Sequence, residues 1–264
     1  MIRFTAATQH DLPALTELWQ LCFGDDAKLI NAFWQALFGK LRVFCAADGK
    51  KTVAFLCAMP TTLVDDEGGE HPTAYLYAVC TAPAYRRRGI SSALMRFAEN
   101  ALQKDGFLFT ALVPAEESLF DFYAKQGYRT ACYHRSYTVA AGKSAAKITP
   151  IHADAYRNLR QMQLYGSAIL YPLPLLEWQE SVGGLYRVET ADTVCCAAAE
   201  VYGDRCICKE LLPDCPEAAA ALAAKLGCTE ALVRTDGVEQ KFGMLKPLQD
   251  VSVPEMAYLG LAFD

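Results

Sequence analysis

Three consecutive arginines and a glycine separate an apolar run from a helix-like segment in YAVCTAPAYRRRGISSALMRF, residues 77–97. A chain that passes from a strand through a glycine-containing turn directly into a helix gathers unpaired backbone N–H groups at the helix start. Such groups and the positive end of the helix dipole bind phosphate, and glycine permits a close approach of the backbone. Arg86, Arg87 and Arg88 add charges that can bind phosphate oxygens in pairs. The pattern predicts a polyphosphate site, with a solvated basic loop as the alternative.

The segments around this turn have the periods of regular secondary structure. From Ile90 onward, apolar residues recur at i, i+3, i+4, i+7, i+8, i+11 and i+12, which is one face of a helix. Strands are predicted at residues 2–8, 41–48, 52–60, 74–81, 106–113 and 128–139, and helices at 10–24, 26–39 and 116–127. This alternation predicts an α/β fold for the first 140 residues.

The second half of the chain repeats part of this order. Residues 140–147, AAGKSAAK, are small and without pattern, so we expect a linker between a domain at 1–140 and another at 141–264. Three strand-like runs fill residues 185–214, and a helix is predicted at 215–227. Ala-Leu-Val at 111–113 recurs at 231–233, and the same offset of 120 relates Phe122 to Phe242. We interpret this as an internal duplication.

The duplicated half lacks the basic turn. Asp214 and Glu217 stand where the first half has arginines, and Gly243 stands where it has Tyr123. Acidic residues at a helix start stabilise the helix dipole but repel phosphate. The second domain is therefore expected to have no phosphate loop.

The composition describes a globular chain of 264 residues with 53% hydrophobic residues and a net charge of −5. No apolar run reaches the roughly eighteen residues that cross a bilayer, and no signal-like segment opens the sequence, so we expect a cytoplasmic protein without a membrane partner. The acidic balance argues against general affinity for nucleic acid. It favours a cationic small molecule or a basic peptide as the partner.

The eleven cysteines form no C-x-x-C pair, and most lie in apolar runs such as AFLCAM and VCCAAAEV. We interpret them as small buried side chains in a reducing compartment rather than as a disulfide or zinc framework. The four histidines are scattered, so no metal site is expected.

The arginine turn resembles a signature of a known enzyme family. Arg86-x-x-Gly89-x-Ser91 is similar to R/Q-x-x-G-x-G/A, the acetyl-CoA-binding signature of the GNAT superfamily of N-acetyltransferases, although Ser91 replaces the usual Gly or Ala. The resemblance implies the GNAT fold, a mixed central sheet flanked by helices, with acetyl-CoA as the co-substrate. With the internal duplication it implies two tandem GNAT-like domains, a catalytic one at 1–140 and a degenerate one at 141–264. It implies that the fourth strand binds the pantetheine and acetyl group at Val79 and Cys80. The pyrophosphate would be bound by Arg86, Arg87, Arg88, Gly89, Ile90, Ser91 and Ser92.

A second motif contains the candidate catalytic residue. FDFYAKQGY, residues 120–128, resembles the F-Y-x-x-x-G-F segment of the same family, although Glu116 and Leu119 replace the Asn and Ala of many relatives. The resemblance implies that Tyr123 donates its proton to the CoA thiolate, with a packing tyrosine as the alternative. For Cys80, a buried strand residue is favoured over a nucleophile because direct transfer from the thioester needs no acyl-enzyme. VCTAPAYRRRG and Tyr123 also resemble aminoglycoside acetyltransferases of the enhanced-intracellular-survival type.

The implied reaction transfers an acetyl group to a primary amine of a small cationic molecule or a peptide. A general base is not assigned; the candidates are Asp25, Asp26, Glu70, His71, Glu116 and the terminal carboxylate of Asp264. Tyr165, Tyr171 and Trp178 are expected either to line the acceptor site or to pack in the core. The alternative function is a non-catalytic acyl-CoA-binding sensor.

Overall fold

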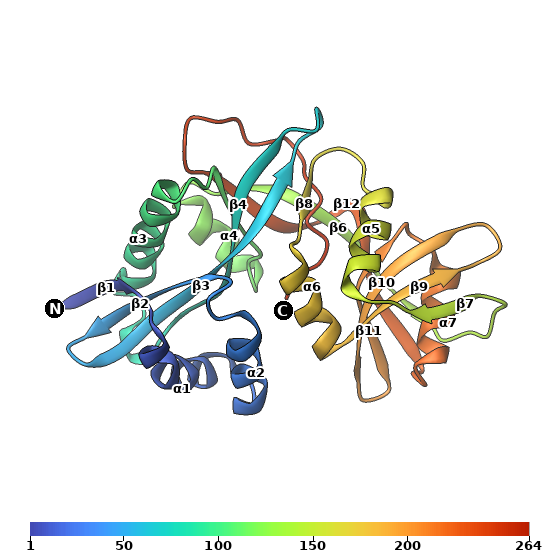
Figure 1. Cartoon of the computed structure of the whole chain (residues 1–264), viewed down its shortest axis with the longest axis horizontal. Helices are drawn as coiled ribbons and strands as arrows, with labels where there is room; N and C mark the ends of the chain where they lie inside the picture. Colours follow the sequence, from blue (N-terminus) through green and yellow to red (C-terminus); the bar gives the residue numbers. More distant parts are fainter. Residues whose placement is uncertain (264) are drawn as a thin grey trace. The chain divides into compact units, whose positions relative to one another are not determined.

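The computed structural model describes residues 1–263, which form two compact units (Figure 1). The first unit contains Met1–Thr62, His71–Arg129 and Met244–Val253, and the second contains the other described residues. No single cut in the chain therefore separates the two units. The assignment of residues 1–140 and 141–264 as functional domains stays a prediction.

The first unit is built on a mixed sheet in the order β1-β2-β3-β4-β5-β12. Strands β1 to β3 pair antiparallel in sequence, β4 and β5 pair parallel, and the end of β12 pairs antiparallel with β5. A parallel pair needs a crossover, which the helix α3 provides between β4 and β5. The strands are β1 (Ile2–Ala6), β2 (Arg42–Asp48), β3 (Lys51–Val64), β4 (Glu70–Thr81), β5 (Phe109–Leu112) and β12 (Glu230–Pro247).

Helices cover both faces of this sheet, because alternate residues of β3 and β4 point to opposite sides. On one face, Trp19 of α1 (Leu12–Phe23) lies with its ring centroid 5.8 Å from that of Phe55 and 5.7 Å from that of Tyr77. The next helix, α2 (Ala27–Leu37), completes this aromatic cluster. Figure 1 shows α1 and α2 together on this side of the strands.

The opposite face is covered by α3 (Ile90–Lys104) and α4 (Glu117–Ala124). Leu94 of α3 belongs to one buried cluster with Leu56 and Leu76, the neighbours in sequence of Phe55 and Tyr77. The predicted apolar stripe of α3 therefore forms part of the core of the first unit, as the helical spacing indicated.

A polar network lies inside this apolar core. Tyr128 donates a hydrogen bond of 2.9 Å to Oε1 of the buried Glu99 and is 2.9 Å from Thr110 Oγ1. Lys246 Nζ, from the end of β12, lies 2.6 Å from Glu99 Oε2. A buried carboxylate is stable only when it is paired and hydrogen-bonded, and Glu99 has both kinds of partner. The ion pair thus attaches the last strand to α3.

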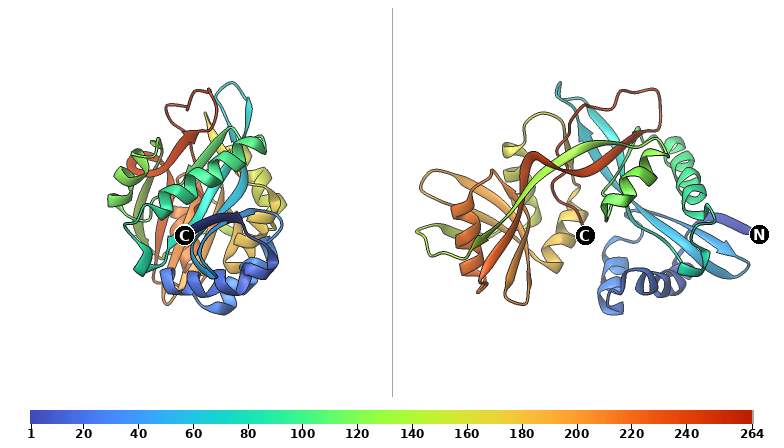
Figure 2. Two further views of the ribbon diagram at one scale, coloured as in Figure 1. Left: turned by 90° about the vertical axis from the view of Figure 1, so that its left-hand side faces the viewer. Right: turned by 180° about the vertical axis from the view of Figure 1, so that it is seen from behind.

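The second unit has the strand order β12-β11-β10-β9-β7, and β6 pairs with β12 (Figure 2). Helix α7 packs on one face through Ala219 and Leu222. On the other face, Tyr156 of α5 donates a hydrogen bond to Glu210, and Gln179 of α6 donates one to Glu200. The elements are β6 (Arg129–Ala140), β7 (Lys147–Pro150), α5 (Ala153–Gln163), β8 (Ala168–Leu170), α6 (Leu173–Val182), β9 (Gly184–Glu189), β10 (Val194–Tyr202), β11 (Arg205–Leu212) and α7 (Pro216–Lys225).

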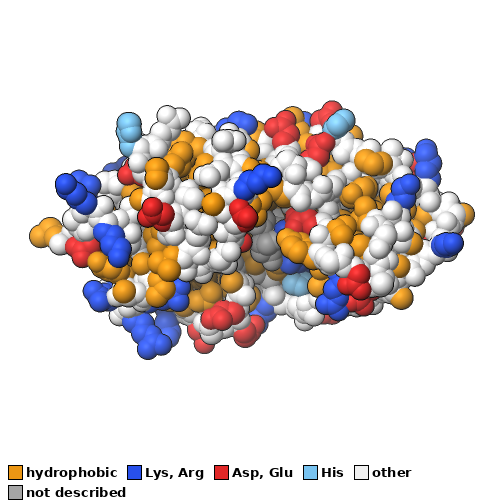
Figure 3. Space-filling view, turned by 90° about the horizontal axis from the view of Figure 1, so that it is seen from below, with side chains coloured by type: hydrophobic (Ala, Val, Ile, Leu, Met, Phe, Trp, Pro, Cys, Tyr) orange, Lys and Arg blue, Asp and Glu red, His pale blue; other side chains and the backbone are white. Residues whose placement is uncertain are grey.

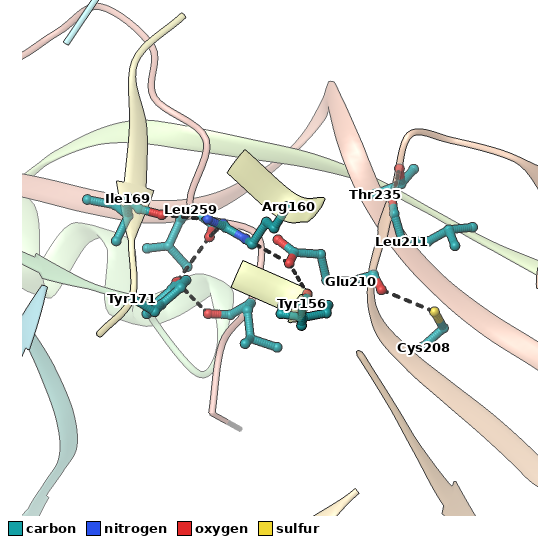
Figure 4. Close-up of polar contacts among 10 residues, drawn as sticks. Tyr156, Arg160, Ile169, Tyr171, Cys208, Glu210, Leu211, Thr235 and Leu259 are labelled. Atoms are coloured by element: carbon teal, nitrogen blue, oxygen red, sulfur yellow. Dashed lines mark hydrogen bonds and ion pairs between the residues drawn. The ribbon is translucent and has the colours of Figure 1, made fainter. Parts of the chain in front are cut away.

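A buried arginine holds the last part of the chain in the second unit (Figure 4). Arg160 Nε lies 2.8 Å from Glu210 Oε2, and its other nitrogens donate to the carbonyls of Ile169 at 2.9 Å and Leu259 at 3.1 Å. Tyr171 donates through its hydroxyl to the carbonyls of Leu259 and Leu261. These hydrogen bonds compensate for the removal of the two charges from water.

The order of elements is repeated between the halves, as the sequence predicted. The unit β4–α3–β5 corresponds to β11–α7–β12, and both strand pairs are parallel. Ala111 and Ala231 both follow the crossover helix. The match of Phe122 with Phe242 was wrong as a structural equivalence, because Phe122 lies in α4 and Phe242 in β12. β12 continues as a strand where the first half forms a helix.

The segment at 141–146 has no helix or strand, but it belongs to the second unit. The N–H of Ala141 donates to the carbonyl of Thr229 at 2.9 Å, and the N–H of Gly142 donates to that of Ala220 at 3.1 Å.

Nine of the eleven cysteines are buried, as their apolar surroundings in the sequence indicated. None of the helices within residues 1–263 has the length and apolar character needed to span a membrane.

Replacing Lys246 by Met should lower the free energy of unfolding by about 3 kcal/mol, because Glu99 would keep a buried charge without its cation. The measurement is urea denaturation followed by circular dichroism. Arg42→Gln is the control: Arg42 pairs with Asp105 at 2.9 Å, but the two side chains are 62% and 40% exposed, so the loss should stay below about 1 kcal/mol. The double variant Glu99→Gln/Lys246→Met should lose less than Lys246→Met alone. Equal losses in Lys246→Met and Arg42→Gln would contradict a structural role of the buried pair.

Candidate active site

The turn before α3 has an unusual backbone. A short 3-10 helix, η2 (Pro83–Tyr85), follows β4, and α3 begins at Ile90. Between them, Arg87 has φ of 62° and Gly89 has φ of 73°, both left-handed. Glycine adopts this conformation freely, whereas for Arg87 it costs on the order of 1 kcal/mol or more. Left-handed residues in such a turn aim successive N–H groups into one concave, anion-binding surface.

The three arginines of the turn are exposed, and two of them contact neighbouring groups. Arg86 Nε donates to the carbonyl of Thr81 at 3.1 Å, so its side chain lies back along the end of β4. The guanidinium of Arg88 lies 5.0 Å from the ring centroid of Tyr85, a cation–π distance. The turn therefore has a positive surface next to its left-handed backbone.

The end of β4 separates from β5. The two strands pair only from Thr73 to Tyr75, and β4 continues to Thr81. Ala78 has φ of 51°, a left-handed conformation in the middle of a strand, and the next two residues are Val79 and Cys80. Backbone groups beyond Tyr75 on this edge are not used in the ladder with β5, so they can bond another group.

The thiol of Cys80 is buried. Burial raises the pKa of Cys80 well above its usual range, and contact with the sulfur of Cys22 raises it further. A thiol with a raised pKa stays protonated at neutral pH and is a poor nucleophile. This agrees with the interpretation of Cys80 as a strand residue whose backbone matters.

Tyr123 lies in α4 and is only 7% exposed. Its ring centroid is 5.1 Å from that of Phe122 and 5.9 Å from that of Tyr128. Burial raises the pKa of Tyr123 to about 12, so the phenol is protonated throughout the neutral range. Tyr123 can therefore act as a proton donor and not as a base. Tyr128 connects it to Glu99 and the polar network of the core.

Three candidate bases already have hydrogen-bonding roles in the fold. Asp25 accepts a hydrogen bond of 2.7 Å from the indole N–H of Trp19. Asp26 caps the start of α2, and Glu116 precedes α4 and accepts one of 2.6 Å from the hydroxyl of Ser118. Each contact stabilises a helix start or a connection between helices.

The remaining candidates are placed differently. Glu70 begins β4 and is exposed, and the ring of His71 lies 5.8 Å from that of Phe109. Asp264 lies outside the described residues. The assignment of the general base stays a prediction.

The aromatic residues of the second half differ in burial. Tyr171 and Trp178 are buried in the second unit, and Tyr165 is 85% exposed. The sequence left two interpretations open for these residues, a wall of the acceptor site or packing in the core. Core packing applies to Tyr171 and Trp178.

The sequence did not predict the structural roles of three residues of the first unit, Glu99, Lys246 and Ala78. Glu99 follows Met95 by four residues and precedes Leu102 by three on α3, so a carboxylate on the apolar face was the available signal. Lys246 has no such signal, because its partner lies 147 residues away. The left-handed Ala78 also has none, since alanine rarely adopts that conformation.

Comparisons with known proteins agree with the fold. Residues 3–131 match the family model of the acetyltransferase (GNAT) domain. Comparison with curated proteins gives no match.

Solved structures match over nearly the whole chain. A GCN5-related N-acetyltransferase from Anabaena variabilis is 15% identical, with a TM-score of 0.72, over 94% of this chain and 73% of its own. One from Kribbella flavida is 16% identical, with a TM-score of 0.67, over 93% and 70%. Eis1 from Mycobacterium abscessus is 13% identical, with a TM-score of 0.62, over 94% and 74%. At these identities the likeness shows the fold, a mixed α/β GNAT architecture. Residues 3–131 therefore form a GNAT acetyltransferase domain, and enzymes of this family use acetyl-CoA as the co-substrate.

Proposed function

We propose that the first unit transfers an acetyl group from acetyl-CoA to a primary amine of a small cationic molecule or of a peptide. The observation that carries the proposal is the turn before α3, where Arg87 and Gly89 are both left-handed and three arginines are exposed. A strained arginine costs stability, and an anion-binding turn is a physical reason for it to persist.

The turn and the end of β4 would hold the two ends of the co-substrate. The N–H of Arg86 already donates to the carbonyl of Pro83 at 3.3 Å, so the N–H groups from Arg87 to Ser92 would bind the pyrophosphate, and the dipole of α3 would add to their field. Val79 and Cys80 follow the left-handed Ala78, and their backbone groups lie in the part of β4 that does not pair with β5. These groups would bind the pantetheine and the oxyanion formed when the amine attacks the carbonyl carbon.

Tyr123 would complete the transfer. As the C–S bond breaks, the leaving sulfur acquires negative charge, and the protonated phenol of Tyr123 would donate its hydrogen to that sulfur. Its burial among Phe122 and Tyr128 would keep water away and fix the ring orientation. The incoming amine must be neutral, and a lysine-like amine is mostly protonated at pH 7. A base or a water chain would therefore take its proton.

We propose residues 141–264 as a domain that does not catalyse the transfer, in contrast to a catalytic domain at 1–140. Asp214 lies between β11 and α7, where the second half corresponds to the arginine turn of the first. It is 2.8 Å from Arg135 and accepts a hydrogen bond of 2.6 Å from Tyr137. A carboxylate at this point repels phosphate. Because β12 continues as a strand, this half also has no helix in the place of α4.

A cationic acceptor is supported by charge. The chain has a net charge of −5, which argues against general affinity for nucleic acid, and Figure 3 shows both acidic and basic side chains on the face in view. Residues 64–72, VDDEGGEHP, contain four acidic side chains, of which Asp65 accepts a hydrogen bond from the N–H of Gly69 at 2.7 Å and Asp66 accepts one from Ser167. The buried thiols support work in a reducing compartment such as the cytoplasm.

The test is mass spectrometry of products after the purified protein and acetyl-CoA are incubated with polyamines, aminosugars, amino acids and basic peptides. An acetylated amine is expected in at least one class, and its identity selects between small-molecule and peptide acceptors. Absence of any product, while acetyl-CoA still raises the melting temperature, would favour the acyl-CoA-binding sensor.

Tyr123→Phe should lower kcat about 100-fold and leave the KM for acetyl-CoA within about twofold, because only the proton donor is removed. In the native enzyme kcat/KM should rise from pH 6.5 to 9 as the amine loses its proton. No falling limb from Tyr123 is expected in this range, because its pKa of about 12 keeps the phenol protonated. Tyr202→Phe, at a tyrosine that is 63% exposed, is the control and should leave kcat unchanged. A Tyr123→Phe enzyme with native kcat would refute the role.

Arg88→Gln should raise the Kd for acetyl-CoA about five-fold, because one charge next to the phosphates is lost from an exposed site. Isothermal titration calorimetry at low and high salt measures this, and the native protein should show the steeper salt dependence. Arg96→Gln, on the exposed side of the same helix and outside the turn, should leave the Kd unchanged. Equal effects of the two variants would mean that the turn does not bind the phosphates.

A further inference from the structure

The second unit contains a cavity of about 610 Å³. Five segments of the chain form its walls, and all of them belong to this unit: the loop before β4, strand β6, the connection between α5 and β8, the middle of β12, and residues 254–258. Cavities that bind small organic molecules commonly measure about 300–1,000 Å³. Among residues 1–263, none of the candidates for acetyl-CoA binding or for proton donation lines this cavity.

Hydrogen bonds between the segments fix the walls of the cavity. Ser167 is buried and donates through its hydroxyl to Asp66 of the loop before β4. The carbonyl of Ser167 accepts from the N–H of Tyr258 at 2.8 Å. The N–H of Ala257 donates to the carbonyl of Ala131 in β6, also at 2.8 Å. The cavity is therefore built into the fold of the second unit.

The charge on the lining is entirely negative. Asp66, Asp236 and Glu255 line the cavity, and no lysine, arginine or histidine of the described residues does. Asp236 and Glu255 are exposed and form no hydrogen bond or ion pair with the other residues that the structure describes. Other carboxylates of this unit are paired, as Glu230 is with Arg205. The unpaired carboxylates leave a negative potential in the cavity that attracts a cation.

Apolar and aromatic side chains line the same cavity. Tyr133, Tyr165 and Tyr258 contribute to the walls, and Tyr165 is 85% exposed. Met256 and Val238 also line it and are exposed. Aromatic faces attract ammonium groups, and alkyl chains pack on exposed apolar side chains. The lining therefore combines groups that bind positive charge with groups that bind a hydrocarbon stem.

We propose that this cavity binds a linear polyamine, an organic polycation with an apolar stem. The three carboxylates come from three segments of the chain, and the cavity has room for many atoms, since one water molecule occupies only about 30 Å³. Several ammonium groups along one flexible chain suit such a lining better than one compact ion. The proposal does not depend on acetyl transfer, because every lining residue belongs to the second unit.

The first experiment is isothermal titration calorimetry of the full-length protein with spermidine, without acetyl-CoA and at low salt. Spermidine should bind, and its affinity should fall as salt is added, because the Debye length shrinks to about 10 Å at roughly 0.1 M salt. Octanediol lacks the charges, and Mg²⁺ lacks the stem and releases its water reluctantly, so each should bind at least about tenfold more weakly. Absence of spermidine binding at millimolar concentration, or equal affinity for Mg²⁺, would overturn the proposal.

The carboxylates are tested with a matched pair of double variants. Asp236→Asn/Glu255→Gln should weaken spermidine binding about tenfold, because two exposed charges are removed from the lining. Asp192→Asn/Glu217→Gln changes the net charge by the same amount at two exposed carboxylates of this unit that do not line the cavity. This control should change the affinity less than about twofold. Equal losses in the two double variants would mean that net charge alone attracts spermidine.

Tyr165 tests the aromatic wall. Tyr165→Ala should weaken spermidine binding about threefold, whereas Tyr165→Phe, which keeps the ring, should stay within about twofold of the native affinity. Tyr202→Ala is the control, at a tyrosine of the second unit that is 63% exposed and does not line the cavity. It should leave the affinity unchanged. A native affinity in Tyr165→Ala would contradict the proposed site.

Hydrogen–deuterium exchange locates the bound spermidine. Peptides that contain residues 234–239 and 254–258 should exchange more slowly in its presence, and Asp236→Asn/Glu255→Gln should abolish this protection. Tyr123→Phe should bind spermidine as the native protein does, whatever its acetyl-transfer rate, so the two proposals can fail independently. Protection confined to other peptides, or loss of spermidine binding in Tyr123→Phe, would place the ligand outside this cavity and refute the assignment.

Discussion

The ion pair between Glu99 and Lys246 is the interaction on which the first unit depends. It removes a carboxylate and an ammonium from most of their water, and it is stable because Tyr128 supplies a further hydrogen bond. The pair joins the helix that begins at the arginine turn to a strand from the far end of the chain. Tyr128 in turn contacts Tyr123. The positions of the arginine turn and of the candidate proton donor are thus coupled to one buried charge.

The local parts of this architecture could be predicted from the sequence because they depend on local spacing. The apolar face of α3 follows from residues three and four apart, and the strand–turn–helix order around Arg86 follows from a change of period. What could not be predicted depends on distant contacts or on strain. Nothing in the sequence near Lys246 indicates that it pairs with Glu99, and nothing near Ala78 indicates a left-handed strand residue. The Phe122 and Phe242 match failed because a repeated residue can lie in a helix in one copy and in a strand in the other.

The two halves show how one topology can have different charges at the same point. β4–α3–β5 and β11–α7–β12 share parallel pairing and a crossover helix. In the first half the helix start has three arginines and a left-handed backbone, whereas in the second Asp214 is bound to Arg135 and Tyr137. The fold requires the crossover but does not require the basic turn, so the charge of the turn can differ between the halves without a change of topology.

The composition of the first unit has a consequence for synthesis. Domains of a nascent chain commonly fold in order from the N-terminus, each when its own residues have left the ribosome. Here the unit that begins at residue 1 takes its last strand from Met244–Val253. Until those residues emerge, the free edge of β5 and the carboxylate of Glu99 lack their native partners. The arginine turn and Tyr123 can therefore reach their final arrangement only after residues 244–253 have been made.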